Sequence, residues 1–269
     1  MDDIKLILDG RCVECDATTP RDLLEGHPEG TIAIVNGRHV DPGSRLKDGD
    51  SVYLMEGGRG FVTKATETLL SQRYSRPVYE KLSGIRIGVA GLGGIGSHVA
   101  EALVRAGVGH LVIADFDRVD QTNLSSQNYF AEDIGKGKAE ATASILRRIR
   151  PDADIVPVDV RLTPGNVCSV FSGCNIVCEA FDRSESKSML VESLLMGDPR
   201  VTVVSCSGMA GFGSSNTIVT ERRMSRLYIC GDGESDADSG EGLVASRVMV
   251  CAGHVANMAV RLAIGRPEP

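Results

Sequence analysis

A glycine-rich turn between an apolar run and a helix-like segment constrains this chain more than any other feature. Residues 85–96 read IRIGVAGLGGIG, in which Gly91, Gly93 and Gly96 have the spacing Gly-x-Gly-x-x-Gly. Such glycines permit a tight turn and let phosphate groups approach the backbone and the positive end of the following helix. Asp115 ends the next apolar run, where a carboxylate can accept hydrogen bonds from ribose hydroxyls. The pattern predicts a nucleotide-binding turn; the alternative is a turn needed only for close packing of the helix.

Apolar strands alternate with amphipathic helices along the part of the chain that contains this turn. The predicted strands are residues 85–90, 110–115, 155–160, 175–181 and 201–207. The predicted helices are residues 97–107, 138–150, 186–197 and 243–265. The alternation predicts parallel βαβ units, and therefore an α/β fold with a doubly wound, mainly parallel Rossmann-like sheet.

The first 57 residues follow another pattern. Two β-rich runs, a short helical segment and further β-rich runs succeed one another, separated by turns rich in Gly, Asn and Asp. This order predicts a small ubiquitin-like β-grasp domain over residues 1–57. Residues 58–82 are polar and partly helical, interrupted by Pro77, and are predicted to be a linker. The Rossmann-like domain then covers residues 83–269.

Charge and composition exclude several classes of function. The 269 residues carry a formal net charge of -7, and only 4% are aromatic. An acidic chain with few aromatic side chains is a poor general binder of nucleic acids or anionic membranes. No apolar run reaches the roughly 18 residues that a membrane span needs, and the first residues lack the pattern of a signal peptide. These features lead us to expect a cytoplasmic protein.

The eight cysteines are expected to be reduced thiols rather than a disulfide framework. Cys12 and Cys15 form the only Cys-x-x-Cys pair, and the sequence offers no second pair to complete a structural zinc site. We therefore expect no zinc.

Two charged residues favour ATP over a dinucleotide. Asp182 follows the predicted strand at 175–181, and in an open parallel sheet such a position lies in the ligand crevice. Because a carboxylate beside phosphates is repulsive unless a cation intervenes, Asp182 indicates Mg²⁺. Lys138, which begins a predicted helix, can supply positive charge to the same polyphosphate. Either residue alone could be an ordinary surface charge.

Residues 73–264 resemble the ThiF/MoeB/HesA-type adenylyltransferases of the ubiquitin-activating-enzyme superfamily, and most of all the ThiF subgroup without zinc cysteines. The resemblance rests on short motifs in the expected order: RYSR, GLGGIG, DFDRVDQTNL, GKGKAE, EAFD and CGDGES. Residues 1–57 resemble a ThiS-type sulfur carrier. The resemblance implies a nucleotidyltransferase that uses ATP and Mg²⁺ to adenylylate the C-terminal glycine of a separate ubiquitin-like sulfur carrier in thiamine biosynthesis, with release of pyrophosphate.

The resemblance also implies roles for individual residues. Lys138 would contact the triphosphate, Asp182 would bind Mg²⁺, and Arg76 would reach the ATP site of a neighbouring subunit, which implies a homodimer. The residues implied in nucleotide binding are Gly91, Gly93, Gly94, Gly96, Asp115, Asp117, Asn123, Gln127 and Lys138. Cys230 precedes an acidic, Gly/Ser-rich loop and is a candidate for a sulfur-relay or thioester-forming thiol, with Cys206 as the alternative. The sulfur donor is not identified.

Two departures from the family pattern affect these expectations. Ser126 stands where an ATP-binding arginine is expected, so that another cation, Arg183 or Arg118, must substitute or activity must be weak. The Gly57-Gly58 end of the carrier-like segment is followed by Arg59 rather than by a free carboxylate, which favours a docking or structural role for that segment.

Other functions stay open at this point. They are activation of a molybdopterin-type carrier, activation of a carboxylate on tRNA, a nucleotide-binding scaffold with weakened catalysis, and an NAD-dependent dehydrogenase. Cys168, Cys174, Cys178 and Cys251 are expected to be buried.

Overall fold

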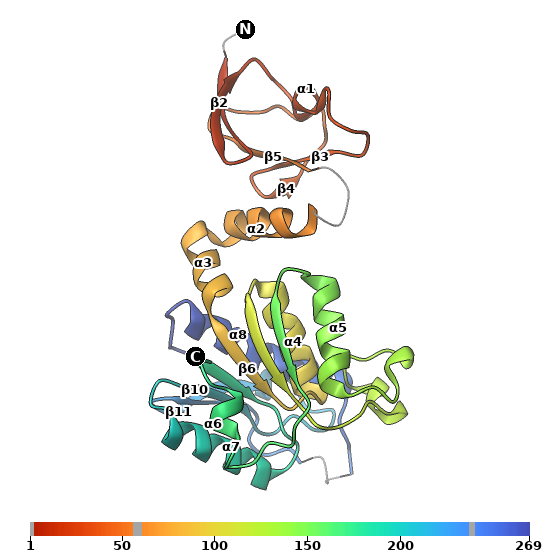
Figure 1. Cartoon of the computed structure of the whole chain (residues 1–269), viewed down its shortest axis with the longest axis vertical. Coiled ribbons are helices and arrows are strands. Elements are labelled where there is room, and N and C mark those ends of the chain that lie inside the picture. Colours follow the sequence, from red (N-terminus) through yellow and green to blue (C-terminus); the bar gives the residue numbers. More distant parts are fainter. Residues whose placement is uncertain (1–2, 56–60, 237–239) are drawn as a thin grey trace. The chain divides into compact units, whose positions relative to one another are not determined.

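A computed structural model describes residues 3–55, 61–236 and 240–269. The chain divides into two compact units, residues 1–80 and 81–269 (Figure 1). The predicted Gly57-Gly58-Arg59 segment lies outside the described residues. Within the described ranges, no helix is long and apolar enough to cross a membrane.

The N-terminal unit is built on a five-stranded sheet with the order β2-β1-β5-β3-β4. Its strands are β1 (Ile4–Leu8), β2 (Arg11–Cys15), β3 (Ile32–Val35), β4 (Arg38–His39) and β5 (Ser51–Met55). Strands β1 and β5 are parallel neighbours, and the other pairs are antiparallel. Helix α1 (Pro20–Leu24) connects β2 to β3. The order of two strands, a helix and further strands is the predicted one, and the two-residue strand β4 was not predicted.

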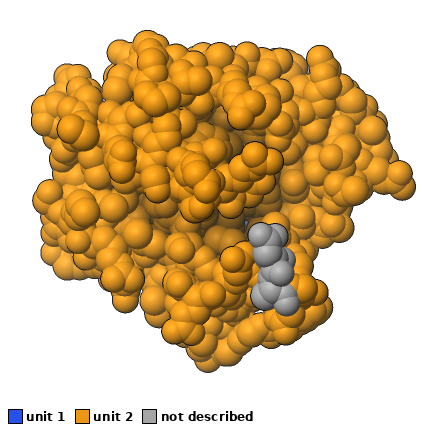
Figure 2. Space-filling view, turned by 90° about the horizontal axis from the view of Figure 1, so that it is seen from below, with its two compact units in different colours: residues 1–80 blue, residues 81–269 orange. Residues whose placement is uncertain are grey.

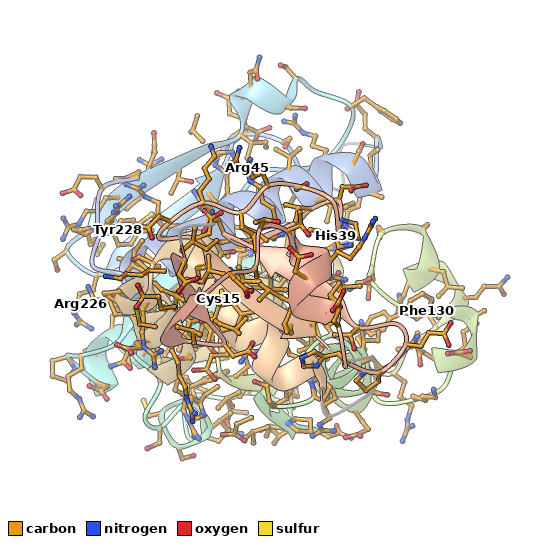
Figure 3. The ribbon with its side chains drawn as sticks, turned by 90° about the horizontal axis from the view of Figure 1, so that it is seen from above. Cys15, His39, Arg45, Phe130, Arg226 and Tyr228 are labelled. Atoms are coloured by element: carbon orange, nitrogen blue, oxygen red, sulfur yellow. The ribbon has the colours of Figure 1, made fainter. Side chains whose placement is uncertain are left out.

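The Cys-x-x-Cys pair lies on strand β2. Cys15 pairs with Ile4 and Cys12 with Ile7 across the antiparallel ladder (Figure 3, where Cys15 is labelled). Because successive side chains of a strand point to opposite faces, residues three apart face away from each other. Extended backbone therefore separates the two thiols.

Two helices occupy most of the predicted linker. Helix α2 (Phe61–Tyr74) is followed by α3 (Arg76–Gly84). The break lies at Ser75, whose φ of 76° is a left-handed conformation that ends a right-handed helix. Pro77 was predicted to interrupt the segment. It stands instead in the first turn of α3, where its missing N–H is tolerated.

The C-terminal unit contains a seven-stranded sheet with the order β11-β12-β10-β9-β6-β7-β8. Only the edge strand β11 is antiparallel to its neighbour, so the predicted doubly wound, mainly parallel α/β sheet is confirmed. The strands are β6 (Arg86–Ala90), β7 (His110–Ala114), β8 (Asp154–Val158), β9 (Ile176–Glu179), β10 (Thr202–Cys206), β11 (Val219–Met224) and β12 (Leu227–Gly231). The strands between β6 and β10 occupy the predicted segments within a few residues.

The main helices of this unit also follow the predicted pattern. They are α4 (Gly94–Ala106), α5 (Lys138–Ile149), α6 (Val167–Val170), α7 (Ser184–Gly197) and α8 (Ala245–Ala263). Helix α8 packs on α4 and on the central strands, which explains why its sequence is apolar around much of its circumference. The four-residue helix α6 and the hairpin of β11 and β12 were not predicted.

Candidate functional site

The strand order creates a crevice between the ends of β6 and β9. From β6 the chain winds outward through β7 to β8 and then returns to the other side of β6 as β9. Ligands of open α/β sheets bind at such a switch point, outside the carboxyl ends of the strands. A cavity of about 650 Å³ lies there, lined by residues that include Gly91 and Asp182. The face of this unit seen in Figure 2 is hollowed near its centre.

The cavity gathers most of the residues singled out in the sequence. Those that line it are Gly91, Gly93, Gly94, Asp115, Asp117, Gln127, Lys138 and Asp182. Gly96, Asn123 and Cys230 do not line it. Arg76 belongs to the N-terminal unit, where it forms a 2.9 Å ion pair with Glu80 on the same helix.

The glycine turn combines an unusual backbone conformation with a close approach. Gly91 has a φ of 86°, and a Cβ there would lie 2.9 Å from the carbonyl oxygen of Ala180. A Cβ at Gly96 would lie only 1.8 Å from the carbonyl oxygen of Gly91. Gly96 thus lets helix α4 begin directly against the turn, while Gly93 and Gly94 face the cavity. Close packing therefore explains Gly96, whereas Gly93 and Gly94 stand where a ligand in the cavity could approach the backbone.

The backbone holds the Asp115 carboxylate in place at the end of β7. Its Oδ2 accepts a hydrogen bond from the Leu92 N–H at 2.7 Å, and its Oδ1 accepts one from the Asp117 N–H at 2.8 Å. Burial raises the pKa of Asp115, although these two hydrogen bonds and the Lys138 charge oppose the rise. Each carboxylate oxygen retains a second lone pair, which a ribose hydroxyl could use.

Lys138 is a buried cation in the cavity wall. Its side chain is only 8% exposed, and its Nζ lies 3.4 Å from Oδ2 of Asp117. The Lys138 N–H donates to the Asp117 carbonyl at 2.8 Å, which fixes the start of α5 beside the cavity. A buried ammonium with one long ion pair can give its remaining donors to an anionic ligand.

Gln127 presents an unsatisfied acceptor. Its Oε1 is buried and has no hydrogen-bond partner among the described residues, although the residue lines the cavity. An orphaned buried acceptor is costly unless a ligand or water completes it. Asn123 has a different role, because its Oδ1 accepts from the Asp120 N–H at 3.1 Å and so caps a short 3₁₀ helix.

Asp182 is exposed at the mouth of the cavity, two residues past Ala180. The described residues contain no group of three or more His, Cys, Asp or Glu side chains that could hold a metal ion. Mg²⁺ commonly binds one or two carboxylates together with substrate phosphates and water. Asp182, which lines the same cavity as the glycine turn, fits a phosphate-bound Mg²⁺ and does not fit a site made of protein ligands alone.

The structure corrects the expectation for Cys230. This residue precedes the acidic loop, as expected, but it lies within strand β12 and has no exposed surface. Burial raises the pKa of its thiol to about 12, although a hydrogen bond with Thr220 opposes the rise. Cys230 is therefore placed as a core residue and not as an accessible nucleophile. Cys168, expected to be buried, is exposed.

The two cations proposed to replace the family arginine at position 126 differ in their placement. Arg183 lines the cavity. Arg118 does not line it, and it donates to the Gly135 carbonyl at 2.8 Å. Arg161, to which the sequence did not point, also lines the cavity. Its Cζ atom lies 5.1 Å from the ring centroid of Phe116.

A buried polar cluster at the end of β9 and β10 also escaped the sequence analysis. Glu179, fully buried, pairs with Lys187, whose Nζ also contacts Cys206 Sγ at 3.3 Å. Lys187 and Cys206 line the cavity. The signal that could have found it is Glu179 itself, a charged residue at the end of an apolar central strand, which requires a buried partner.

Comparison with known proteins gives a consistent family assignment. The sequence model of the ThiF family matches residues 66–269. The adenylyltransferase and sulfurtransferase UBA4 of Candida glabrata is 30% identical over 219 residues, 79% of this chain and 47% of that protein. The sulfur carrier protein ThiS adenylyltransferase of Bacillus subtilis is 32% identical over 143 residues, 52% of this chain and 42% of that protein.

The fold is shared with a solved structure of low sequence identity. The crystal structure of E. coli tRNA N6-threonylcarbamoyladenosine dehydratase in complex with ATP aligns with a TM-score of 0.69 and 21% identity, covering 76% of this chain and 95% of that chain. The matches span less than half the length of the curated relatives.

Proposed function

Because this chain belongs to the ThiF family, we propose that it is an ATP-dependent adenylyltransferase that activates the C-terminal glycine of a ubiquitin-like sulfur carrier. The single observation that carries this proposal is the cavity at the switch point, which brings together the glycine turn, Asp115, Lys138 and Asp182. We assign the carrier to the ThiS type of thiamine biosynthesis, supported by the similarity to the Bacillus subtilis enzyme.

The proposed reaction requires positioning more than covalent chemistry. A carboxylate oxygen of the carrier's last glycine attacks the α-phosphorus of ATP, the bond from that phosphorus to the pyrophosphate oxygen breaks, and an acyl-adenylate forms. The glycine turn would hold phosphates against backbone N–H groups, Asp115 would hold the ribose, and Lys138 would stabilise charge that develops on the phosphates. Asp182 would hold Mg²⁺, which neutralises negative charge on the phosphates when bound.

The missing family arginine has a substitute in this proposal. Arg183 and Arg161 line the cavity, whereas Ser126 does not. We assign the charge that position 126 lacks to Arg183, which directly follows Asp182. Arg183 would supply this charge without any contact from the segment that contains Ser126.

We propose that residues 1–57 form a ThiS-like β-grasp domain with a docking or structural role. The mixed sheet with β1 and β5 parallel at its centre, and the helix between β2 and β3, support this assignment. In the sequence Arg59 follows Gly57-Gly58, so this segment offers no free glycine carboxylate for adenylylation.

We further propose a homodimer in which Arg76 of each subunit completes the ATP site of its partner. This assignment rests on the family resemblance of the RYSR segment. Arg76 is exposed, and its ion pair with Glu80 is a surface pair of the kind that exchanges partners at little cost.

The test is carrier-dependent exchange of pyrophosphate into ATP, with carriers of the thiamine and molybdopterin types that end in a free Gly-Gly. We expect exchange with the ThiS-type carrier and its loss in Asp182→Ala. The matched control is Asp198→Ala, which removes a carboxylate that pairs with Arg200 at 2.8 Å at the opposite end of the sheet and does not line the cavity. Full exchange in Asp182→Ala would refute the assigned site.

A second candidate substrate is a carboxylate on tRNA, because the E. coli dehydratase shares the fold and the tRNA threonylcarbamoyladenosine dehydratase of Escherichia coli K12 is 36% identical over 120 residues. The net charge of -7 weighs against it. ATP consumption stimulated by tRNA and not by any carrier would favour this alternative.

A further inference from the structure

The wall of the cavity carries a thiol that the proposed adenylylation does not use. Cys206 is the last residue of β10, and Lys187 lies in the first turn of α7. Both line the cavity. Lys187 Nζ contacts Cys206 Sγ at 3.3 Å and the two carboxylate oxygens of Glu179 at 3.2 and 3.1 Å. The three donors of the ammonium thus have three partners, one of which is the sulfur.

The surroundings fix Glu179, and Glu179 in turn fixes Lys187. The fully buried carboxylate of Glu179 accepts the Phe181 N–H at 2.7 Å and the Ser205 hydroxyl at 2.5 Å, in addition to the ammonium. A buried carboxylate that accepts this many hydrogen bonds is held in one rotamer. The ammonium is therefore held against Cys206 by a rigid partner.

The ionisable groups around Cys206 come from four elements. They are Cys178 and Glu179 on β9, Lys187 on α7, Cys230 on β12 and Cys251 on α8. A hydrogen bond with Cys251 and then the Lys187 charge lower the pKa of Cys206, although burial and Glu179 oppose this effect. In contrast, burial raises the pKa of Cys174 and that of Cys230 to about 12.

We propose that Cys206 is a second reactive centre of the cavity, a thiol that hydrogen peroxide oxidises. Its contact with a fixed ammonium and its place in the cavity wall carry this proposal. Because Cys206 is only 1% exposed, the reactant must be a small electrophile that enters through the cavity. The chemistry at sulfur is independent of the proposed function, whereas the expected protection of Cys206 by ATP rests on that function.

Oxidation of the Cys206 thiol needs no reagent other than hydrogen peroxide. The sulfur electron pair attacks one oxygen of hydrogen peroxide, the O–O bond breaks, and the departing hydroxide takes the thiol proton and becomes water. Sulfur is oxidised by two electrons to a sulfenic acid, and the peroxide is reduced. The sulfenic acid either persists or condenses with the Cys251 thiol, in which case an S–S bond forms and water is lost.

The first test maps reactivity residue by residue in the full chain. Limiting iodoacetamide at pH 7, with peptide mass spectrometry over time, should label Cys206 at least about tenfold faster than Cys174, Cys178 or Cys230, since the thiolate is the nucleophile. Hydrogen peroxide should then oxidise Cys206 first, seen as a dimedone adduct or as a disulfide with Cys251. Labelling of Cys206 no faster than of these buried cysteines would overturn the proposal.

Two sets of variants test the cause of the reactivity. Lys187→Met should slow labelling of Cys206, and Lys187→Arg should restore part of the rate. Since loss of Lys187 leaves Glu179 unpaired and can impair folding, Cys251→Ala and Cys251→Ser provide the second set. Cys251→Ala removes the hydrogen-bonding thiol and should slow labelling several-fold, whereas Cys251→Ser keeps a donor and should slow it less. Unchanged labelling in both Lys187→Met and Cys251→Ala would contradict the assigned environment.

Protection by ligand separates this inference from the proposed function. Saturating ATP with Mg²⁺ should slow labelling of Cys206 and leave the exposed Cys12 of the other unit unaffected. Selective labelling without protection would support the reactive thiol and count against the nucleotide site. Protection without selective labelling would support the nucleotide site and refute the reactive thiol.

Discussion

At the scale of one residue, the buried Lys138 provides a test of ATP binding in the cavity. We expect Lys138→Met to weaken binding of ATP with Mg²⁺ about tenfold to a hundredfold, because a hydrogen bond to a charged group contributes roughly 1.5–3 kcal/mol. Calorimetric titration measures the change. Lys136→Met is the matched control, since Lys136 is 52% exposed, pairs with Asp133 at 2.8 Å and does not line the cavity. Equal affinities of the two variants would remove Lys138 from the site.

Gly96 carries a prediction about stability rather than binding. Gly96→Ala places a methyl group 1.8 Å from the Gly91 carbonyl oxygen, so the turn or the helix must shift. We expect a loss of about 1–3 kcal/mol in the free energy of unfolding, measured by urea denaturation. Gly253→Ala is the control, because that helical glycine has open space around it and should gain up to about 1 kcal/mol. An unchanged Gly96→Ala midpoint would contradict the close packing.

The glycine turn, Asp115 and Lys138 could be predicted from the sequence because their signal is local. Each of them stands just after a strand or at the start of a helix, and the hydrophobic pattern of that strand or helix is strong. The contact of Lys187 with Glu179 and Cys206 could not be predicted, because the three residues come from three different elements and nothing in their spacing indicates a contact. Asn123 and Gln127 looked alike in the sequence, yet only Gln127 lines the cavity.

At the scale of elements, one buried ion pair joins loops that are far apart in the sequence. Arg247 of α8 donates to the Ser214 carbonyl at 2.6 Å, to the Thr217 hydroxyl at 3.1 Å and to Asp232 Oδ2 at 2.5 Å. The segments after β10 and after β12 are thereby attached to the same helix. Residues 233–236, which line the cavity, follow directly from Asp232.

This ion pair predicts a pH dependence of stability. Burial tends to raise the pKa of Asp232, but hydrogen bonds from Ser235, Glu234 and Arg247 lower it to about 2, below the ordinary value of 3.8. A carboxyl whose folded pKa is lowered stabilises the protein above its unfolded pKa and loses that contribution as pH falls. The difference in unfolding free energy between the wild type and Asp232→Asn should therefore shrink as the pH falls from about 5 to about 3. A difference in unfolding free energy that stays constant over this pH range would contradict a stabilising role of the ionised Asp232.

The elements that escaped prediction have identifiable causes. Strand β11 reads VTERRM, is largely exposed at the edge of the sheet and lacks apolar alternation. Its partner β12 was therefore not predicted as a strand, and Cys230 was assigned an accessibility that it does not have. Central strands such as β6 were predictable, because burial on both faces requires a continuous apolar run.

At the scale of the whole molecule, the proposed homodimer makes a quantitative prediction. Arg76→Ala and Asp182→Ala should each abolish exchange if Arg76 acts in the partner's site. In an equal mixture that exchanges subunits, half of the dimers are mixed, and each mixed dimer has one site with both residues intact. Mixing should therefore restore about one quarter of wild-type exchange. Unmixed preparations assayed at the same total concentration are the control. If pyrophosphate exchange does not recover after verified subunit exchange, Arg76 acts in the site of its own subunit or outside any site.

The two amide hydrogen bonds to Asp115 have a consequence for the kinetics of ligand capture. The rotamer of this carboxylate is already selected before any sugar hydroxyl arrives, so its ordering entropy is lost during folding and not at the encounter. Preorganised acceptors of this kind remove a rearrangement from the association step. The bimolecular rate constant should then respond to solvent viscosity and ionic strength rather than to a slow isomerisation of the empty protein.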